Sequence, residues 1–99
     1  MKKHDALIRI RFFTTAEGGR KSDLFARHYG CPLFIDGYEE HGFDCRFMLD
    51  ADTHLELGIA PDIKIKFLNP DLALAQLKKG VSISLWEGRT IAIGHRQPL

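Results

Sequence analysis

The sequence of 99 residues has little cysteine and no long hydrophobic run. Its two cysteines are too few for the disulfide framework that stabilises small secreted folds. No stretch approaches the roughly 20 apolar residues of a transmembrane helix. Arg9 and Arg11 also interrupt the apolar run that follows the basic residues 2 and 3, so a signal peptide is not expected. These absences predict a cytoplasmic protein, not bound to a membrane, in which Cys31 and Cys45 are reduced and buried.

A strong net charge is also missing, because 14 basic and 13 acidic side chains almost cancel. The charges are unevenly spread along the chain. Residues 1–30 carry seven basic and three acidic side chains, residues 31–62 carry one and eight, and residues 63–99 carry six and two. One interpretation is a surface on which the charges mix after folding, and the other is a polarised surface that steers a charged partner. The near-neutral balance differs from that of a dedicated nucleic-acid-binding domain.

The sequence does have the composition of an ordinary globular domain, with 44% hydrophobic and 27% charged residues. Its length is close to the commonest domain size, so residues 1–99 are predicted to form one domain. Apolar and polar residues alternate in five segments and less regularly in a sixth, which is the period of a strand with one buried face. The segments are residues 7–13, 32–40, 43–50, 62–68, 81–86 and 89–95.

Six short strands with tight glycine turns predict an all-β fold, either a sandwich or a six-stranded antiparallel closed barrel. Closure suits so short a chain because it removes exposed sheet edges. The residues expected in the core include Ile10, Phe47, Ile65 and Ile83, and Ile91 and Ile93 are expected to share one face. Two segments could be helical, residues 22–28 and residues 71–79. Asn69 could cap the second, for which the alternative is a strand running into a loop.

Motifs for chemistry are scarce. Lys21 and Ser22 follow two glycines, but a phosphate-binding loop would need glycine where Thr15 stands. Cys31 and Cys45 lack the paired spacing of structural zinc ligands, and no serine lies in a nucleophile elbow. We therefore expect no bound nucleotide, no metal, no cofactor and no catalysis. The lesser alternative is an enzyme whose reacting residues meet only in the folded chain.

Two glycine turns lie beside cationic side chains. Residues 17–20 read Glu-Gly-Gly-Arg, and residues 87–89 read Glu-Gly-Arg. At such a turn, exposed backbone N–H groups and the paired N–H groups of a neighbouring guanidinium can together bind phosphate oxygens. The alternative is that both are plain hairpin turns, in each of which the Glu and the Arg form a local ion pair of small net value.

Taken in order, these motifs resemble the C-terminal β-barrel domain (domain 3) of elongation factor Tu, here as a stand-alone domain. The family pattern begins with a strand and E-G-G-R, and ends with L-x-P followed by a second E-G-G-R. The similarity extends over residues 6–95, which is nearly the whole chain. The residues that carry it are residues 8–12 and 17–20, Phe25, Tyr29, Pro32, Leu68, Pro70, Gly80, Ile83, residues 87–91 and Gly94.

The resemblance implies a six-stranded antiparallel barrel without catalytic activity. In the family this domain contacts the T-stem backbone of aminoacyl-tRNA, the GTPase domain and the exchange factor. The residues here at the matching tRNA-contact positions are Arg20, Lys21, Ser22, Glu87 and Gly88. Leu33 stands where the family has a tRNA-contacting glutamine, Asn69 stands where a basic residue is frequent, and the second turn lacks one glycine. The scaffold pattern is therefore better preserved than the ligand pattern.

The predicted function is a non-catalytic binding module for a translation-related RNA or protein. For an RNA backbone, Arg20, Lys21 and Arg89 would supply the positive charge. The alternative is a protein-interaction module unrelated to translation that reuses the barrel scaffold. Its contact would be Trp86, which the alternation places opposite the buried Leu85 and which could instead cover one end of the barrel. The candidate binding residues are Arg20, Lys21, Ser22, Trp86, Glu87, Gly88 and Arg89.

Overall fold

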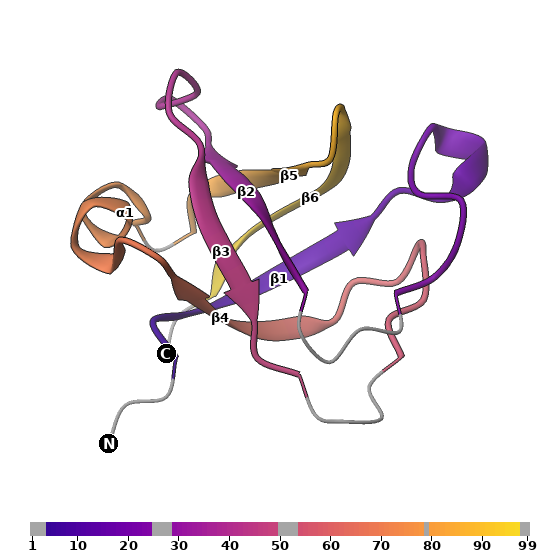
Figure 1. The fold of residues 1–99 in the computed structure, drawn as a ribbon, viewed down its shortest axis with the longest axis horizontal. Coiled ribbons are helices and arrows are strands. Elements are labelled where there is room, and N and C mark those ends of the chain that lie inside the picture. Colours follow the sequence, from indigo (N-terminus) through magenta and orange to yellow (C-terminus); the bar gives the residue numbers. More distant parts are fainter. Residues whose placement is uncertain (1–3, 25–28, 50–53, 79, 98–99) are drawn as a thin grey trace.

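The chain folds into a closed barrel of antiparallel strands, shown in Figure 1. The computed structural model describes residues 4–24, 29–49, 54–78 and 80–97. Within them the strands are β1 (Ala6–Phe12), β2 (Gly30–Ile35), β3 (Phe43–Phe47), β4 (Asp62–Phe67), β5 (Ser82–Trp86) and β6 (Thr90–Gln97). Their order around the barrel is β1-β4-β3-β2-β5-β6, and β6 pairs back with β1. The six-stranded antiparallel closed barrel predicted from the sequence is confirmed.

The strands place their apolar side chains inside the barrel, as their period of two predicts. In β4, Ile63, Ile65 and Phe67 are buried, while the side chains between them are exposed. Similar alternation runs through β1 and β3. The four residues expected in the core are all buried: Ile10, Phe47, Ile65 and Ile83. The cysteines are also as expected, since Cys31 and Cys45 are both buried and both free.

Three aromatic rings form part of the core. Phe12, Tyr29 and Phe47 pack edge to face, with ring centroids 5.1–6.2 Å apart. Such offset packing is the arrangement that aromatic quadrupoles prefer. Because the three rings come from β1, from the residue before β2, and from β3, they link elements that are distant in the sequence.

The alternation predicted for residues 89–95 is wrong at one point. Ile91 and the adjacent Ala92 are both buried, whereas Ile93 is 50% exposed. The cause is a shift in the pairing of β5 with β6 next to Trp86. Such a bulge sets two residues of one strand against one of the other, which reverses the faces beyond it. Ile91 and Ile93 therefore do not share a face.

Among the described residues, two short elements are helical. The segment predicted as a helix or a strand at residues 71–79 is helical as far as Gln76, in α1 (Pro70–Gln76), and residue 79 lies outside the described residues. The Asn69 side chain makes no capping hydrogen bond. The other element is a 3-10 helix, η1 (Thr15–Glu17). The helix expected at residues 22–28 is not seen at Leu24, which forms an isolated β-bridge with Leu55, and residues 25–28 lie outside the described residues. None of the helices in the described part of the chain is both long and apolar enough to cross a lipid bilayer.

A matched pair of substitutions tests the outward position of Ile93. Ile65→Ala empties a fully buried site and should lower the free energy of unfolding by about 2–5 kcal/mol. Ile93→Ala removes a half-exposed side chain and should change that free energy by about 0.5 kcal/mol or less. Urea unfolding of both variants makes the comparison. Equal losses would contradict the bulge in β6.

Candidate functional site

The two glycine turns meet at one end of the barrel. One turn follows η1 and the other joins β5 to β6, and both lie away from α1 in Figure 1. The Arg20 guanidinium binds the Glu87 carboxylate with an Nη1···Oε2 distance of 2.6 Å. A second contact runs from the β5–β6 turn to the turn after η1, where the Arg89 guanidinium donates to the Gly19 carbonyl at 2.9 Å. We call the set Gly19, Arg20, Tyr29, Glu87 and Arg89 the clasp.

The first turn is shaped by a capping box at η1. The Thr14 side chain accepts from the backbone N–H of Glu17, and the Glu17 carboxylate accepts from the backbone N–H of Thr14 at 2.8 Å. This reciprocal bonding satisfies donors at the helix start that would otherwise lack partners. Arg11 of β1 also binds the Glu17 carboxylate, at 2.9 Å, so the turn is tied to the barrel wall. The hydrogen bond from the backbone N–H of Thr14, followed by that from the Arg11 guanidinium, lowers the pKa of Glu17.

The second turn is a tight connection between antiparallel strands. Gly88 has φ 75°, a left-handed conformation that favours glycine. The backbone N–H of Glu87 donates to the carbonyl of Arg89 at 2.9 Å, which closes the turn. Glu87 and Arg89 are thereby held on either side of Gly88 and can both reach the residues after η1.

Tyr29 fastens the clasp to the core. Its ring is packed among the aromatic side chains inside the barrel, and its hydroxyl donates a hydrogen bond to the Glu87 carboxylate. Burial raises the pKa of Tyr29, and the bond to Glu87 raises it further, so the hydroxyl keeps its proton and remains a donor. The Arg20 guanidinium lies 5.6 Å from the ring centroid, within range of a cation–π contact.

The interpretation of each turn as holding its own ion pair is wrong. Glu17 binds Arg11 rather than Arg20, and Glu87 binds Arg20 rather than Arg89. The pairs instead cross between segments that are distant in the sequence. Because spacing along the chain does not reveal which strands become neighbours, sequence reasoning could not assign these partners.

The structure brings the predicted site residues together but gives them different roles. Arg20 and Glu87 neutralise each other, so Arg20 is not a free cation. Lys21 and Ser22 are exposed beside them. Trp86, which immediately precedes the clasp residue Glu87, is 44% exposed. The side chains that can still meet a partner are therefore Lys21, Ser22, Trp86 and the outer edge of Arg89.

Tyr29 is the functional residue that sequence reasoning did not include in the site. In the sequence analysis, Tyr29 was one of the residues that carry the resemblance to the elongation factor Tu barrel, and no role was assigned to it. Leu33 and Asn69, the departures from that pattern, lie elsewhere. Leu33 is fully buried in the barrel, and Asn69 directly precedes α1. A side chain in the position of Leu33 cannot reach a partner in this fold.

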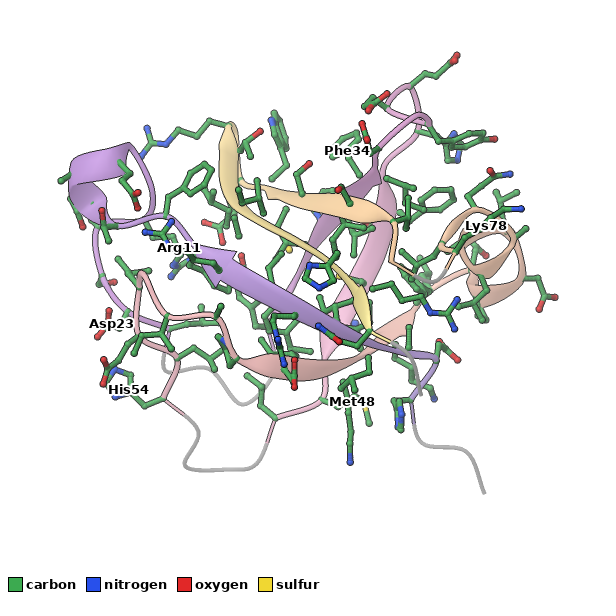
Figure 2. All side chains as sticks on the ribbon, turned by 180° about the vertical axis from the view of Figure 1, so that it is seen from behind. Arg11, Asp23, Phe34, Met48, His54 and Lys78 are labelled. Atoms are coloured by element: carbon green, nitrogen blue, oxygen red, sulfur yellow. The ribbon has the colours of Figure 1, made fainter. Side chains whose placement is uncertain are left out.

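Other polar groups near the clasp do not assemble a metal centre. Asp23 binds His54 at 2.9 Å and accepts from the backbone N–H of Leu57 at 3.1 Å, and Figure 2 shows Asp23 and His54 side by side. The bond from Leu57, followed by that to His54, lowers the pKa of Asp23. Among residues 4–24, 29–49, 54–78 and 80–97, no three His, Cys, Asp or Glu side chains are grouped so that they could hold a metal ion.

Comparison with known proteins gives no relative from which a role could be transferred. No family model matches the chain, and no curated protein matches it. The candidate site therefore depends on the geometry of the clasp.

Two double-mutant cycles test whether the clasp is a stabilising interaction. The Arg20–Glu87 pair is partly buried and shares the Tyr29 hydrogen bond, so Arg20→Ala and Glu87→Ala should show a coupling free energy of about 1 kcal/mol or more. The more exposed Arg11–Glu17 pair is the matched control, with an expected coupling of about 0.5 kcal/mol. Urea unfolding measures both cycles. Coupling no larger at Arg20–Glu87 than at the control would contradict this role.

Proposed function

We propose that this chain is a non-catalytic binding module, similar to the C-terminal barrel of elongation factor Tu, that binds the phosphate backbone of RNA at the clasp. The observation that carries the proposal is the meeting of the two glycine turns through Arg20–Glu87 and Arg89–Gly19. These turns contain the residues at which the resemblance implies tRNA contact. The bonded residues are nearly 70 positions apart in the sequence. We therefore take the meeting of the two turns on one surface as support for a shared binding role.

The clasp has the chemistry that backbone recognition needs. In residues 19–21 and 87–89, which include Lys21 beside the clasp, three cations stand against the single Glu87 carboxylate, which leaves an excess of positive charge. Arg89 uses one nitrogen for the Gly19 carbonyl and can present its other N–H groups to a phosphate. Lys21 is exposed and adds a further positive charge. Such contacts position a nucleic acid by its phosphates and do not read bases.

Arg20 was expected to supply positive charge for an RNA backbone, but its contacts give it another role. Its ion pair with Glu87 and its place over the Tyr29 ring make it a positioning residue, which holds the two turns together. The binding charge then comes mainly from Lys21 and Arg89. With so few phosphate contacts, the affinity should be modest and should depend strongly on salt.

A salt titration against tRNA tests the proposal. With two or three phosphates contacted, the logarithm of the association constant should fall with the logarithm of salt concentration at a slope of about −2. Lys21→Ala should weaken binding and make the slope shallower by about one. Lys78→Ala is the matched control, because Figure 2 places Lys78 beside α1, at the other end of the molecule from Arg11 and η1.

The results that would reject RNA binding at the clasp are clear. One is the absence of any binding at low salt. The other is an equal effect of Lys21→Ala and Lys78→Ala, which would indicate attraction to the whole surface rather than to the clasp.

A second candidate function, protein binding, is supported by Trp86. A large aromatic side chain that is 44% exposed next to a tight turn is suited to anchor an interface. In the sheet it lies on the outer face, as the alternation predicted, opposite in direction to the buried Leu85.

Trp86→Ala tests the protein-binding candidate. Immobilised protein should lose a specific partner when Trp86 is removed, and the loss should not occur with Leu72→Ala, which removes an exposed apolar residue on α1. Because Trp86 is the single tryptophan of the chain, its fluorescence also reports directly on docking at this surface. Retention of the same partner by both variants would argue against Trp86 as the anchor.

A further inference from the structure

The two cysteines face each other across neighbouring strands. Cys31 of β2 and Cys45 of β3 are direct partners in the antiparallel register. Side chains of directly opposite residues leave the sheet on the same face. In this barrel that face is the interior, where both thiols are buried. The two sulfur atoms therefore share one small region of the core.

The hydrogen-bonding pattern shows how far apart the two backbones are at this point. The Phe47 N–H donates to the Tyr29 carbonyl at 2.8 Å, so these two residues form a hydrogen-bonded pair. The type of pair repeats every two residues, which makes Cys31 and Cys45 a pair of the same type. Their Cα atoms are then about 5.5 Å apart. Disulfides span Cα separations of roughly 4.4–6.8 Å, so this separation lies within the range of a bridge.

The two thiols differ in their surroundings. Cys31 is 7% exposed and Cys45 is 1% exposed. A hydrogen bond between the thiols, received by Cys31, lowers the pKa of Cys31 and raises that of Cys45, and burial also raises that of Cys45. Burial and the nearby Glu87 carboxylate act the other way on the pKa of Cys31, and the backbone N–H of Trp86 lowers it further. Cys31 thus lies next to the clasp as the more reactive sulfur, with Cys45 behind it.

We propose that Cys31 and Cys45 are a site of reversible oxidation, at which a peroxide joins β2 to β3 through a disulfide. The Cys31 thiolate attacks one oxygen of hydrogen peroxide. The O–O bond breaks, hydroxide leaves and takes up a proton as water, and Cys31 becomes a sulfenic acid. Cys31 has then lost two electrons, which the peroxide has gained.

The second step uses the neighbouring thiol. Cys45 gives up its proton and its sulfur attacks the sulfur of Cys31. The S–S bond forms as the S–O bond breaks, and the departing hydroxide takes that proton to leave as water. Overall, one peroxide and two thiols give one disulfide and two waters. A dithiol reductant reverses the change by thiol–disulfide exchange.

Intact-mass spectrometry of the full chain tests the proposal. Hydrogen peroxide should remove two hydrogen atoms from the mass of the folded wild-type protein, and dithiothreitol should restore them. Proteolysis without reductant should yield the Cys31 and Cys45 peptides joined together. This measurement on the wild type does not depend on whether any cysteine variant folds.

Two variants separate the roles of the cysteines. Cys45→Ala leaves Cys31 without a resolving partner, so peroxide should add one oxygen, which a sulfenic-acid reagent such as dimedone should trap. Cys31→Ala leaves only the more deeply buried Cys45, and the peptide that contains Cys45 should gain no oxygen over the same time. Circular dichroism establishes that each variant keeps the strand content of the wild type.

Three outcomes would overturn the proposal. The first is a wild-type mass that peroxide leaves unchanged while the urea-unfolded protein is oxidised. The second is irreversible gain of two or three oxygens without a bridge. The third is a bridge between two chains, seen as a dimer on a non-reducing gel.

Discussion

The pairing of β6 with β1 closes the barrel and fixes the positions of the turns at its ends. The two strands pair along most of their length, from Leu7–Gln97 to Phe12–Ala92. At the crossing, Gly94 lies so close to β1 that a Cβ atom built on it would be 1.9 Å from the carbonyl oxygen of Arg9. Glycine is therefore required there, because a side chain would force the two backbones apart. The same closure brings the end of β1 next to the start of β6, and with them the two turns of the clasp.

The clasp is connected to the core through one side chain. Tyr29 packs against Phe12 and Phe47 inside the barrel and donates its hydroxyl proton to Glu87 at the surface. An aromatic ring with a polar end suits a position that is apolar on one side and polar on the other. The position of Glu87, and through it that of Arg20, is therefore set by the packing of the core rather than by flexible surface contacts. Cys31 lies close to the same hydroxyl, so the proposed oxidation would act on the side chains that hold the clasp.

The distribution of charge in the sequence has a direct structural counterpart. Arg9 belongs to the basic first third of the chain and binds Asp62 of the acidic middle third, with two hydrogen bonds of 2.9 and 3.2 Å. Arg20 binds Glu87 of the last third. These pairs mix the charges of different segments, as one of the two interpretations of the sequence expected. Within the part of the chain that the structure describes, Lys21 and Arg89 form no ion pair, and in the proposed function they are the charges that a phosphate backbone would meet.

The class of fold and most of the core follow from local patterns in the sequence. Alternation is a local property: each strand's own residues decide which face is apolar, so the burial of Ile10, Phe47, Ile65 and Ile83 could be predicted. The helical potential of residues 71–79 was visible for the same reason, although sequence alone did not separate it from a strand. The two glycine turns were recognisable as candidate binding segments, each from its own few residues.

The contacts between distant segments follow from the folded barrel and not from local patterns. The partner of Glu87, the part played by Tyr29 and the register that sets Cys31 against Cys45 all depend on which strands become neighbours in the closed barrel. The outward turn of Ile93 depends on a bulge, which arises from the fit of β6 against β5 and not from the residues of β6 alone. These contacts join residues far apart in the chain, and their energies are realised only when the barrel closes. The residue pattern of a single segment therefore does not predict these contacts.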